Sequence, residues 1–171
     1  MRTDPLPERV DFRRLAAKQV RLSGDLPLKR LARLAERLLD TDGIVQIDAE
    51  FDRDASGRYC LTGQLKTGLP VRCERCLEPM VRQVDQSFCL AAVWSEDDAS
   101  QLPDEYDPWV TGEDPVSLVD IVEEELLLSL PLVNYHETPC MPGLVKTEEE
   151  CVPAAPRQNP FQALEALRKK T

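Results

Sequence analysis

Two cysteines separated by two residues, Cys73 and Cys76, carry the clearest chemical signal in this sequence of 171 residues. They lie between two segments that we expect to be β-strands, and a C-x2-C pair on a hairpin turn lets two thiolates converge on one ion. His136 and Cys140 follow about sixty residues later, where a return across the sheet would bring an imidazole and a third thiolate to the pair. Cys73, Cys76, His136 and Cys140 are therefore candidate ligands of a zinc site, with Cys151 as a competing ligand.

Two other interpretations of the cysteines stay open. Cys73 and Cys76 could be thiols of a tight turn, with Cys60 and Cys89 serving as small hydrophobic side chains in strands. A thioredoxin-like redox motif requires its first cysteine at the N-terminus of a helix. Pro79 and a strand pattern follow here instead, which counts against redox chemistry.

Common catalytic patterns are missing from the sequence. A Ser-His-Asp triad would have to use His136, the only histidine, and the chain has no G-x-S-x-G elbow. Its seven glycines form no phosphate-binding loop, and no spacing singles out two carboxylates for acid/base work or Mg²⁺. We predict that the protein is not an enzyme.

Charge is distributed unevenly along the chain. Residues 1–37 hold ten Lys or Arg against five acids, and residues 157–171 hold four against one. The segment between them carries seven bases and 25 acids, within a total net charge of -10. This separation favours local contact with a polyanion through the two ends, as in a protein that visits an RNA–protein particle. The alternative is a set of solvated helix faces around a soluble centre.

A first helix is predicted between Pro27 and Gly43, because apolar residues recur there at spacings of three and four. Its apolar stripe consists of Leu31, Leu34, Ala35 and Leu38. Three arginines between these positions face outward, where we expect them to contact a partner: Arg30, Arg33 and Arg37.

Three segments in the middle of the chain have the pattern of β-strands. Residues 44–51 alternate between apolar and polar side chains, which is the period of a strand buried on one face. Residues 59–72 keep a similar parity, and residues 80–94 are rich in Val, Phe, Cys and Leu. Because their connections are too short for crossover helices, we expect an antiparallel sheet.

A second helix is expected over residues 115–130, after an exposed acidic loop at residues 95–113. Asp114 and Pro115 form a cap-and-first-turn signal, and Pro131 ends the helix. Its wide apolar surface suits a helix laid across a sheet, with the Glu123 to Glu125 run on the remaining arc. The fold class is therefore α+β: an antiparallel sheet with two packed helices, a Cys-x2-Cys hairpin turn and a mobile C-terminal tail.

We expect one α+β domain over residues 1–137 and a flexible acidic, proline-containing linker with a docking helix over residues 138–171. The domain divides into a basic part at 1–40, the sheet at 43–94, the acidic loop at 95–113 and the helix at 115–130. The terminal helix is too short to be stable alone and so needs a surface on which to fold. Its expected partner-binding residues are Asn159, Pro160, Phe161, Leu164 and Leu167.

The chain contains no apolar stretch that fits a membrane span or a secretory signal. We therefore expect a cytoplasmic protein, whose six cysteines stay reduced or bind metal rather than form disulfides.

Three motifs together resemble the YceD family of large ribosomal RNA subunit accumulation proteins. They are the turn Cys73-Glu74-Arg75-Cys76-Leu77, the acidic-to-aliphatic block at residues 119–133 with His136 and Cys140 behind it, and Asn159-Pro160-Phe161. The resemblance extends from about Val20 to the C-terminus. It implies a bacterial cytoplasmic factor that is needed for 23S ribosomal RNA to be made, processed or accumulated, with no catalytic residues known. The zinc site is our own inference from the four residues.

We therefore expect a non-catalytic ribosome biogenesis factor whose partners are the large-subunit precursor, precursor 23S rRNA or a basic ribosomal protein, and no membrane. One alternative is an RNA-processing enzyme or its subunit, and another is a zinc-stabilised chaperone for a basic ribosomal protein. A thiol oxidoreductase is a third.

Overall fold

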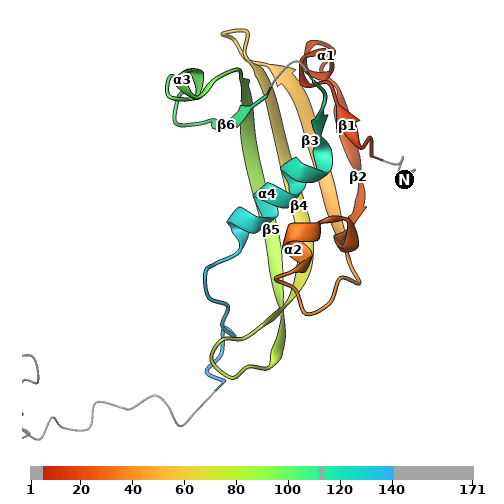
Figure 1. The fold of residues 1–171 in the computed structure, drawn as a ribbon, viewed down its shortest axis with the longest axis vertical. Helices are drawn as coiled ribbons and strands as arrows, with labels where there is room; N and C mark the ends of the chain where they lie inside the picture. The colour runs from red at the N-terminus through yellow and green to blue at the C-terminus, as the bar shows by residue number, and fades with distance from the viewer. Residues whose placement is uncertain (1–5, 112–113, 141–171) are drawn as a thin grey trace, which may run out of the picture. The chain divides into compact units, whose positions relative to one another are not determined.

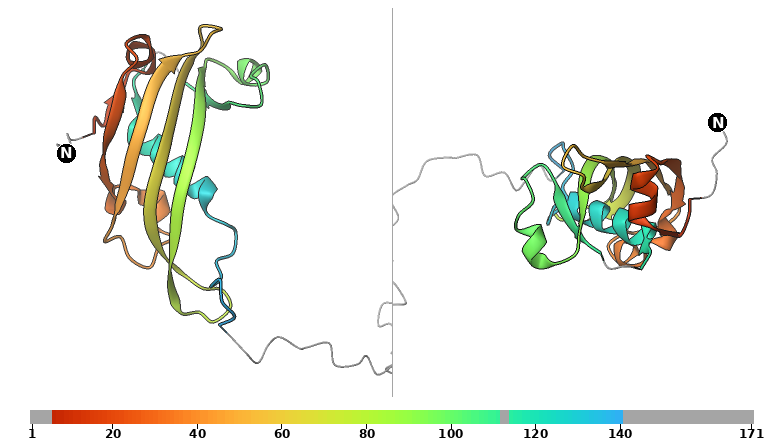
Figure 2. Two further views of the ribbon diagram at one scale, coloured as in Figure 1. Left: turned by 180° about the vertical axis from the view of Figure 1, so that it is seen from behind. Right: turned by 90° about the horizontal axis from the view of Figure 1, so that it is seen from above.

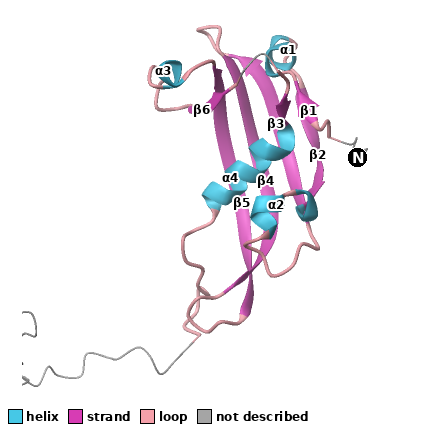
Figure 3. Cartoon of the chain, in the orientation of Figure 1, coloured by secondary structure: helices cyan, strands magenta, loops and turns pink. Residues whose placement is uncertain are grey.

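A computed structural model describes residues 6–111 and 114–140. A five-stranded sheet has the strand order β2-β3-β4-β5-β6, and a second, two-stranded sheet joins β1 to β7 (Figure 1). The strands are β1 (Arg9–Val10), β2 (Arg21–Pro27), β3 (Ile44–Arg53), β4 (Tyr59–Arg72), β5 (Pro79–Val93), β6 (Asp107–Val110) and β7 (Val116–Ser117). The helices are α1 (Phe12–Ala17), the 3-10 turn η1 (Leu28–Arg30), α2 (Ala32–Ala35), α3 (Glu96–Ala99) and α4 (Leu118–Ser129) (Figure 3). The predicted α+β class is confirmed.

Strands β3 to β5 pair antiparallel in sequence order, as expected. Strand β2 adds a further antiparallel strand beside β3, outside the sheet predicted at residues 43–94. The edge strand β6 differs, because it pairs parallel with β5 from Leu90↔Asp107 to Val93↔Val110. The sheet is therefore mixed, and the prediction of a wholly antiparallel sheet is wrong. The predicted loop at residues 95–113 is long enough for a crossover and contains both α3 and β6.

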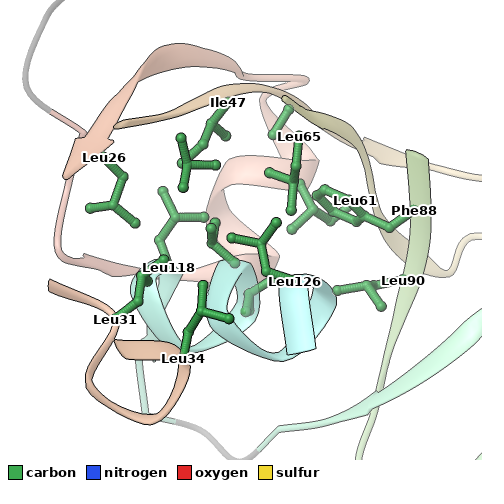
Figure 4. Packing of buried hydrophobic residues seen from close by; sticks show 14 of the residues in the cluster. Leu26, Leu31, Leu34, Ile47, Leu61, Leu65, Phe88, Leu90, Leu118 and Leu126 are labelled. Atoms are coloured by element: carbon green, nitrogen blue, oxygen red, sulfur yellow. The ribbon is translucent and has the colours of Figure 1, made fainter. Parts of the chain in front are cut away.

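Alternation along the strands gives the sheet one apolar and one polar face. On β3 the side chains of Val45, Ile47, Ala49 and Phe51 are buried, and their neighbours point to the opposite face. Helix α4 lies across the apolar face, and among residues 6–111 and 114–140 no helix covers the other face (Figure 2). The core closes around α4, with side chains from the sheet and from the η1–α2 segment (Figure 4).

The first predicted helix is much shorter than expected. Residues 28–35 form the turn η1 and the single turn α2, interrupted at Leu31, whose φ of -99° and ψ of 81° are not helical. The α4 residue Glu123 accepts hydrogen bonds from the backbone N–H groups of Arg33 at 2.7 Å and Leu34 at 3.1 Å. The apolar stripe at Leu31 and Leu34 therefore reflects burial of these residues in the core and not a long helix. The carboxylate of Glu123, from the distant helix α4, caps the N-terminus of α2, for which the local sequence provides no capping side chain.

Helix α4 begins three residues later than predicted. Its N-cap is Ser117, whose hydroxyl accepts a hydrogen bond from the Asp120 N–H at 3.2 Å, so the cap predicted at Asp114 is wrong. The carbonyl of Pro115 instead accepts hydrogen bonds from the Arg9 guanidinium, beside the pairing of β1 with β7. Two of the three glutamates expected on the arc left by the apolar residues, Glu123 and Glu125, are only 6% exposed.

No helix in residues 6–111 and 114–140 is long and apolar enough to cross a bilayer.

Replacement of Glu123 should destabilise the fold far more than replacement of its neighbour. We expect Glu123→Ala to lower the free energy of unfolding by about 1–3 kcal/mol, because two backbone N–H groups lose a charged acceptor. Glu124→Ala is the matched control: this carboxylate forms a solvent-exposed ion pair with Arg33 at 2.7 Å, and exposed pairs contribute little to stability. Urea unfolding of the two variants measures the difference, and equal losses would contradict the capping role.

Glu125 should make stability depend on pH. Burial, with the charges of Asp107 and Glu124 close by, raises the pKa of this carboxyl above its ordinary value. The native state therefore favours the protonated form, so its stabilising contribution is complete below the unfolded pKa and is lost as pH rises through the folded one. We expect Glu125→Gln to raise the free energy of unfolding at pH 7 and to change it little at pH 4. A lower free energy of unfolding for Glu125→Gln than for the unaltered chain at pH 7 would contradict this expectation.

Candidate metal centre

The Cys-x2-Cys turn joins β4 to β5, as predicted, and its backbone is tightly bonded. The N–H of Cys73 donates to the carbonyl of Glu78 at 2.9 Å, and the N–H of Leu77 donates to the carbonyl of Cys73 at 2.8 Å. Leu77 has a φ of 63°, in the left-handed region that usually belongs to glycine. Its side chain is 62% exposed, so the turn presents an aliphatic side chain to solvent directly after the second cysteine.

The chain returns to this turn after α4. Helix α4 ends at Ser129, before Pro131, and the carbonyl of Asn134 accepts a hydrogen bond from the Glu74 N–H at 2.8 Å. Beside this bond the guanidinium of Arg75 lies 5.0 Å from the ring centre of Tyr135. These contacts hold the segment that carries His136 against the hairpin.

The structure brings the four predicted ligands together. One ligand atom from each of Cys73, Cys76, His136 and Cys140 lies within 4.8 Å of all the others, and Cys76 Sγ is 3.4 Å from His136 Nδ1. Ligands at the vertices of a zinc tetrahedron are separated by about 3.5–3.8 Å, so small movements would complete the geometry. Three thiolates and one imidazole are a common donor set of structural zinc sites, and these side chains could hold a metal ion.

The backbone around the cluster favours the thiolate form of Cys73. Burial disfavours that charge, but hydrogen bonds from the backbone N–H groups of Cys76, His136 and Arg75 outweigh burial and lower the pKa of Cys73 to about 6. A thiolate is the form that binds metal. The turn therefore prepares its buried cysteine for an ion or another electrophilic partner.

The remaining described cysteines lie elsewhere. Cys60 is buried in β4 and Cys89 half-buried in β5, and burial raises the pKa of both thiols, as expected for small hydrophobic side chains. Neither belongs to the ligand cluster, and the five cysteines in the described ranges are outside disulfides. Cys151, the competing ligand, lies outside the described residues.

The predicted partner-binding arginines belong to the η1–α2 segment rather than to the cluster. Arg30 forms an ion pair with Glu8 at 2.7 Å, and Arg33 pairs with Glu124. Arg37 is exposed just beyond α2. The predicted docking residues Asn159, Pro160, Phe161, Leu164 and Leu167 lie outside the described residues.

Sequence inspection overlooked Glu123, Glu125 and Leu77. Glu123 and Glu125 carried a weak signal, since a helix so apolar across its width leaves little arc for three glutamates. The left-handed conformation of Leu77 had no signal, because leucine rarely adopts it.

Loss of one buried ligand should abolish metal binding. We expect the full chain, purified without chelator, to carry stoichiometric zinc, and Cys73→Ser to lose it and to unfold at lower temperature. Cys89→Ser, which changes a cysteine outside the cluster, is the control and should keep its metal. Metal analysis and thermal unfolding check both variants, and equal zinc content in the two would refute the assignment.

The sequence is similar to known proteins of one family. Residues 61–168 match the model of the YceD family, described as large ribosomal RNA subunit accumulation protein YceD. A protein of the same name from Haemophilus influenzae is 29% identical over an alignment of 171 positions, which covers 96% of this chain and 97% of that protein. No solved structure matches.

Proposed function

The chain belongs to the YceD family, and from this premise we propose that it is a non-catalytic ribosome biogenesis factor. In this role it supports the accumulation of 23S rRNA while the large subunit assembles. Its partners are the large-subunit precursor, with precursor 23S rRNA or a basic ribosomal protein as the contacted component. The proposal places the protein in the cytoplasm, where ribosomes of bacteria assemble.

The division of charge across the fold carries this proposal. Residues 6–82 contain fifteen Lys or Arg and twelve acids, whereas residues 83–140 contain fourteen acids and no Lys or Arg. The first group forms β1 to β4 with α1 and α2, and the second forms most of β5 with α3, β6 and α4. Strand β6 and most of β5, at one edge of the main sheet, therefore belong to the acidic group, and strands β2 to β4 belong to the group that holds the Lys and Arg residues (Figure 1). Such a molecule can meet phosphates on one side and a cationic protein on the other.

The arginines of the η1–α2 segment are suited to phosphate contact. Arg33 keeps a side chain 61% exposed although it pairs with Glu124, and Arg30 keeps 40% beside Glu8. Exposed ion pairs contribute at most about 1 kcal/mol, so phosphate can replace the carboxylates at little cost. With Arg37 these residues form the proposed RNA-facing group.

A zinc ion in the four-residue cluster would act structurally. It would link the β4–β5 turn to the segment after α4 and hold this end of the domain rigid. In the proposal the protein's contribution is a stable shape and a charge pattern, with no bond made or broken.

A second candidate function is a chaperone for a basic ribosomal protein. The observation that favours it is the run of fourteen acids without a Lys or Arg in residues 83–140. Such a surface complements a highly cationic protein before that protein reaches RNA.

The terminal segment should be required for association but not for folding. We expect Phe161→Ala with Leu164→Ala to reduce co-purification of large-subunit precursors from cells at moderate salt, while the melting temperature stays unchanged. Phe161, Leu164 and Leu167 follow one another at i, i+3 and i+6, which would place them on one side of the proposed terminal helix. Gln162→Ala changes a residue outside this apolar set and is the control. If the double variant also melts at a lower temperature than the unaltered chain, the segment is part of the core. If the unaltered chain recovers neither large-subunit proteins nor their RNA, the proposed function is refuted.

Incubation of the purified chain with precursor 23S rRNA and Mg²⁺ separates this proposal from a processing enzyme. Intact RNA is the expected result. Cleavage that disappears when one carboxylate is replaced would assign catalysis instead.

A further inference from the structure

Strand β5 is much longer than the strand that covers its outer side. Strand β4 pairs with β5 from Arg72↔Pro79 to Cys60↔Ala91, whereas β6 pairs only with Leu90 to Val93. Within residues 6–111 and 114–140, no strand pairs with residues 79–89 on the side away from β4. This length of β5 lies at the margin of the sheet (Figure 2).

An open strand edge is a template for another strand. Alternate residues of β5 turn their N–H and C=O groups toward β4, and those between turn theirs outward. Eleven residues therefore present about five outward-facing residues, enough to pair with an extended peptide of about ten residues.

The edge is accompanied by a hollow at its lower end. A cavity of about 610 Å³ lies beside the metal cluster, lined by residues 80–83 of β5 and 136–138 of the return segment. Val81 contributes an aliphatic side chain that is 59% exposed. A peptide that adds to β5 could place an apolar side chain here.

The charge around this edge selects the kind of peptide. After Arg82 the next Lys or Arg is Lys146. Glu137 lines the hollow together with Arg82, and the side chain of Asp85, 60% exposed on β5, pairs with Lys66 of β4 at 3.3 Å. Glu105 and Asp107 act on Cys89 at the upper end. These four acids outnumber the two bases, so the surroundings of the edge carry a net negative charge. Two copies of such an edge would repel each other, and the edge would also repel the phosphates of RNA.

We propose that residues 79–89 of β5 accept an extended cationic peptide as an added strand, in the manner of β-augmentation. The inference rests on the proposed function, because a biogenesis factor meets the basic tails of ribosomal proteins. To the proposed function it adds where the peptide binds, that the peptide is recognised through its backbone, and that the peptide is cationic. The acidic side chains attract the peptide, and the strand edge fixes its direction and register.

Hydrogen exchange of the full chain with a defined probe tests the proposal. The probe is a synthetic ten-residue peptide of alternating Lys and Val, with both termini blocked. We expect saturating peptide to slow amide exchange in residues 79–89 by at least about tenfold. The opposite edge strand, β2, is the internal control and should exchange at an unchanged rate.

Two altered peptides separate strand addition from simple charge attraction. A peptide with alternate backbone amides N-methylated keeps its charge but loses its strand donors, and it should bind at least about tenfold more weakly. A peptide with Glu in place of Lys should not bind. Equal binding of the methylated peptide would overturn strand addition.

Matched protein variants place the site on one edge. Ser87→Lys adds a positive charge to the exposed face of β5 and should weaken the peptide's affinity severalfold. Ser23→Lys makes the same change on β2 and should leave the affinity unchanged, and the reverse order would overturn the assignment to β5.

The outcomes also separate this inference from the function beneath it. If the peptide fails to protect β5 while the chain still co-purifies with large-subunit precursors, only the inference is overturned. If co-purification fails as well, the proposed function falls with it. Concentration-dependent protection of residues 79–89 without peptide, with a doubled mass by light scattering, would assign the edge to a second copy and overturn the proposal.

Discussion

Helix α4 and the sheet bury one another's apolar surfaces, and this burial positions most of the molecule. Ile121, Val122 and Leu126 are fully buried against strands whose inner side chains are equally inaccessible. Each such side chain contributes about 1.5–3 kcal/mol, so the helix cannot leave the sheet without exposing the core. The same helix carries Glu123 to the N-terminus of α2 and directs the chain toward the Cys-x2-Cys turn. The candidate metal centre is therefore a consequence of how α4 packs.

Much of the sheet could be predicted from the sequence because a strand buried on one face repeats every two residues. Residues 44–51 show this period, and the hairpin position of Cys73 and Cys76 followed from the strands on either side. The meeting of these cysteines with His136 and Cys140 was also predicted and is confirmed by the structure. Occupation of the site by zinc stays a prediction.

The errors arose where tertiary contacts override local pattern. Leu31 and Leu34 have helical spacing, but they belong to separate short turns that place both side chains in the core. The carboxylate of Glu123 in α4 fixes the second turn by accepting hydrogen bonds from its backbone. Strand β6 has only four residues within an acidic stretch, and its parallel pairing depends on the length of a crossover rather than on its composition. The raised pKa of Glu125 depends partly on a strand that the pattern did not predict, since β6 carries the charge of Asp107 close to it.

The cluster of four candidate metal ligands has a topological consequence. Cys76 and His136 are separated by sixty positions, and a single ion bound by both would close that entire stretch into a ring. By the loop-entropy relation used for disulfides, a ring of this size restricts the unfolded chain by about 4 kcal/mol. A covalent cross-link of that strength requires oxidation, whereas an ion provides it under reducing conditions and releases it when metal is scarce. The rigidity of this domain would then follow the supply of metal to the cell.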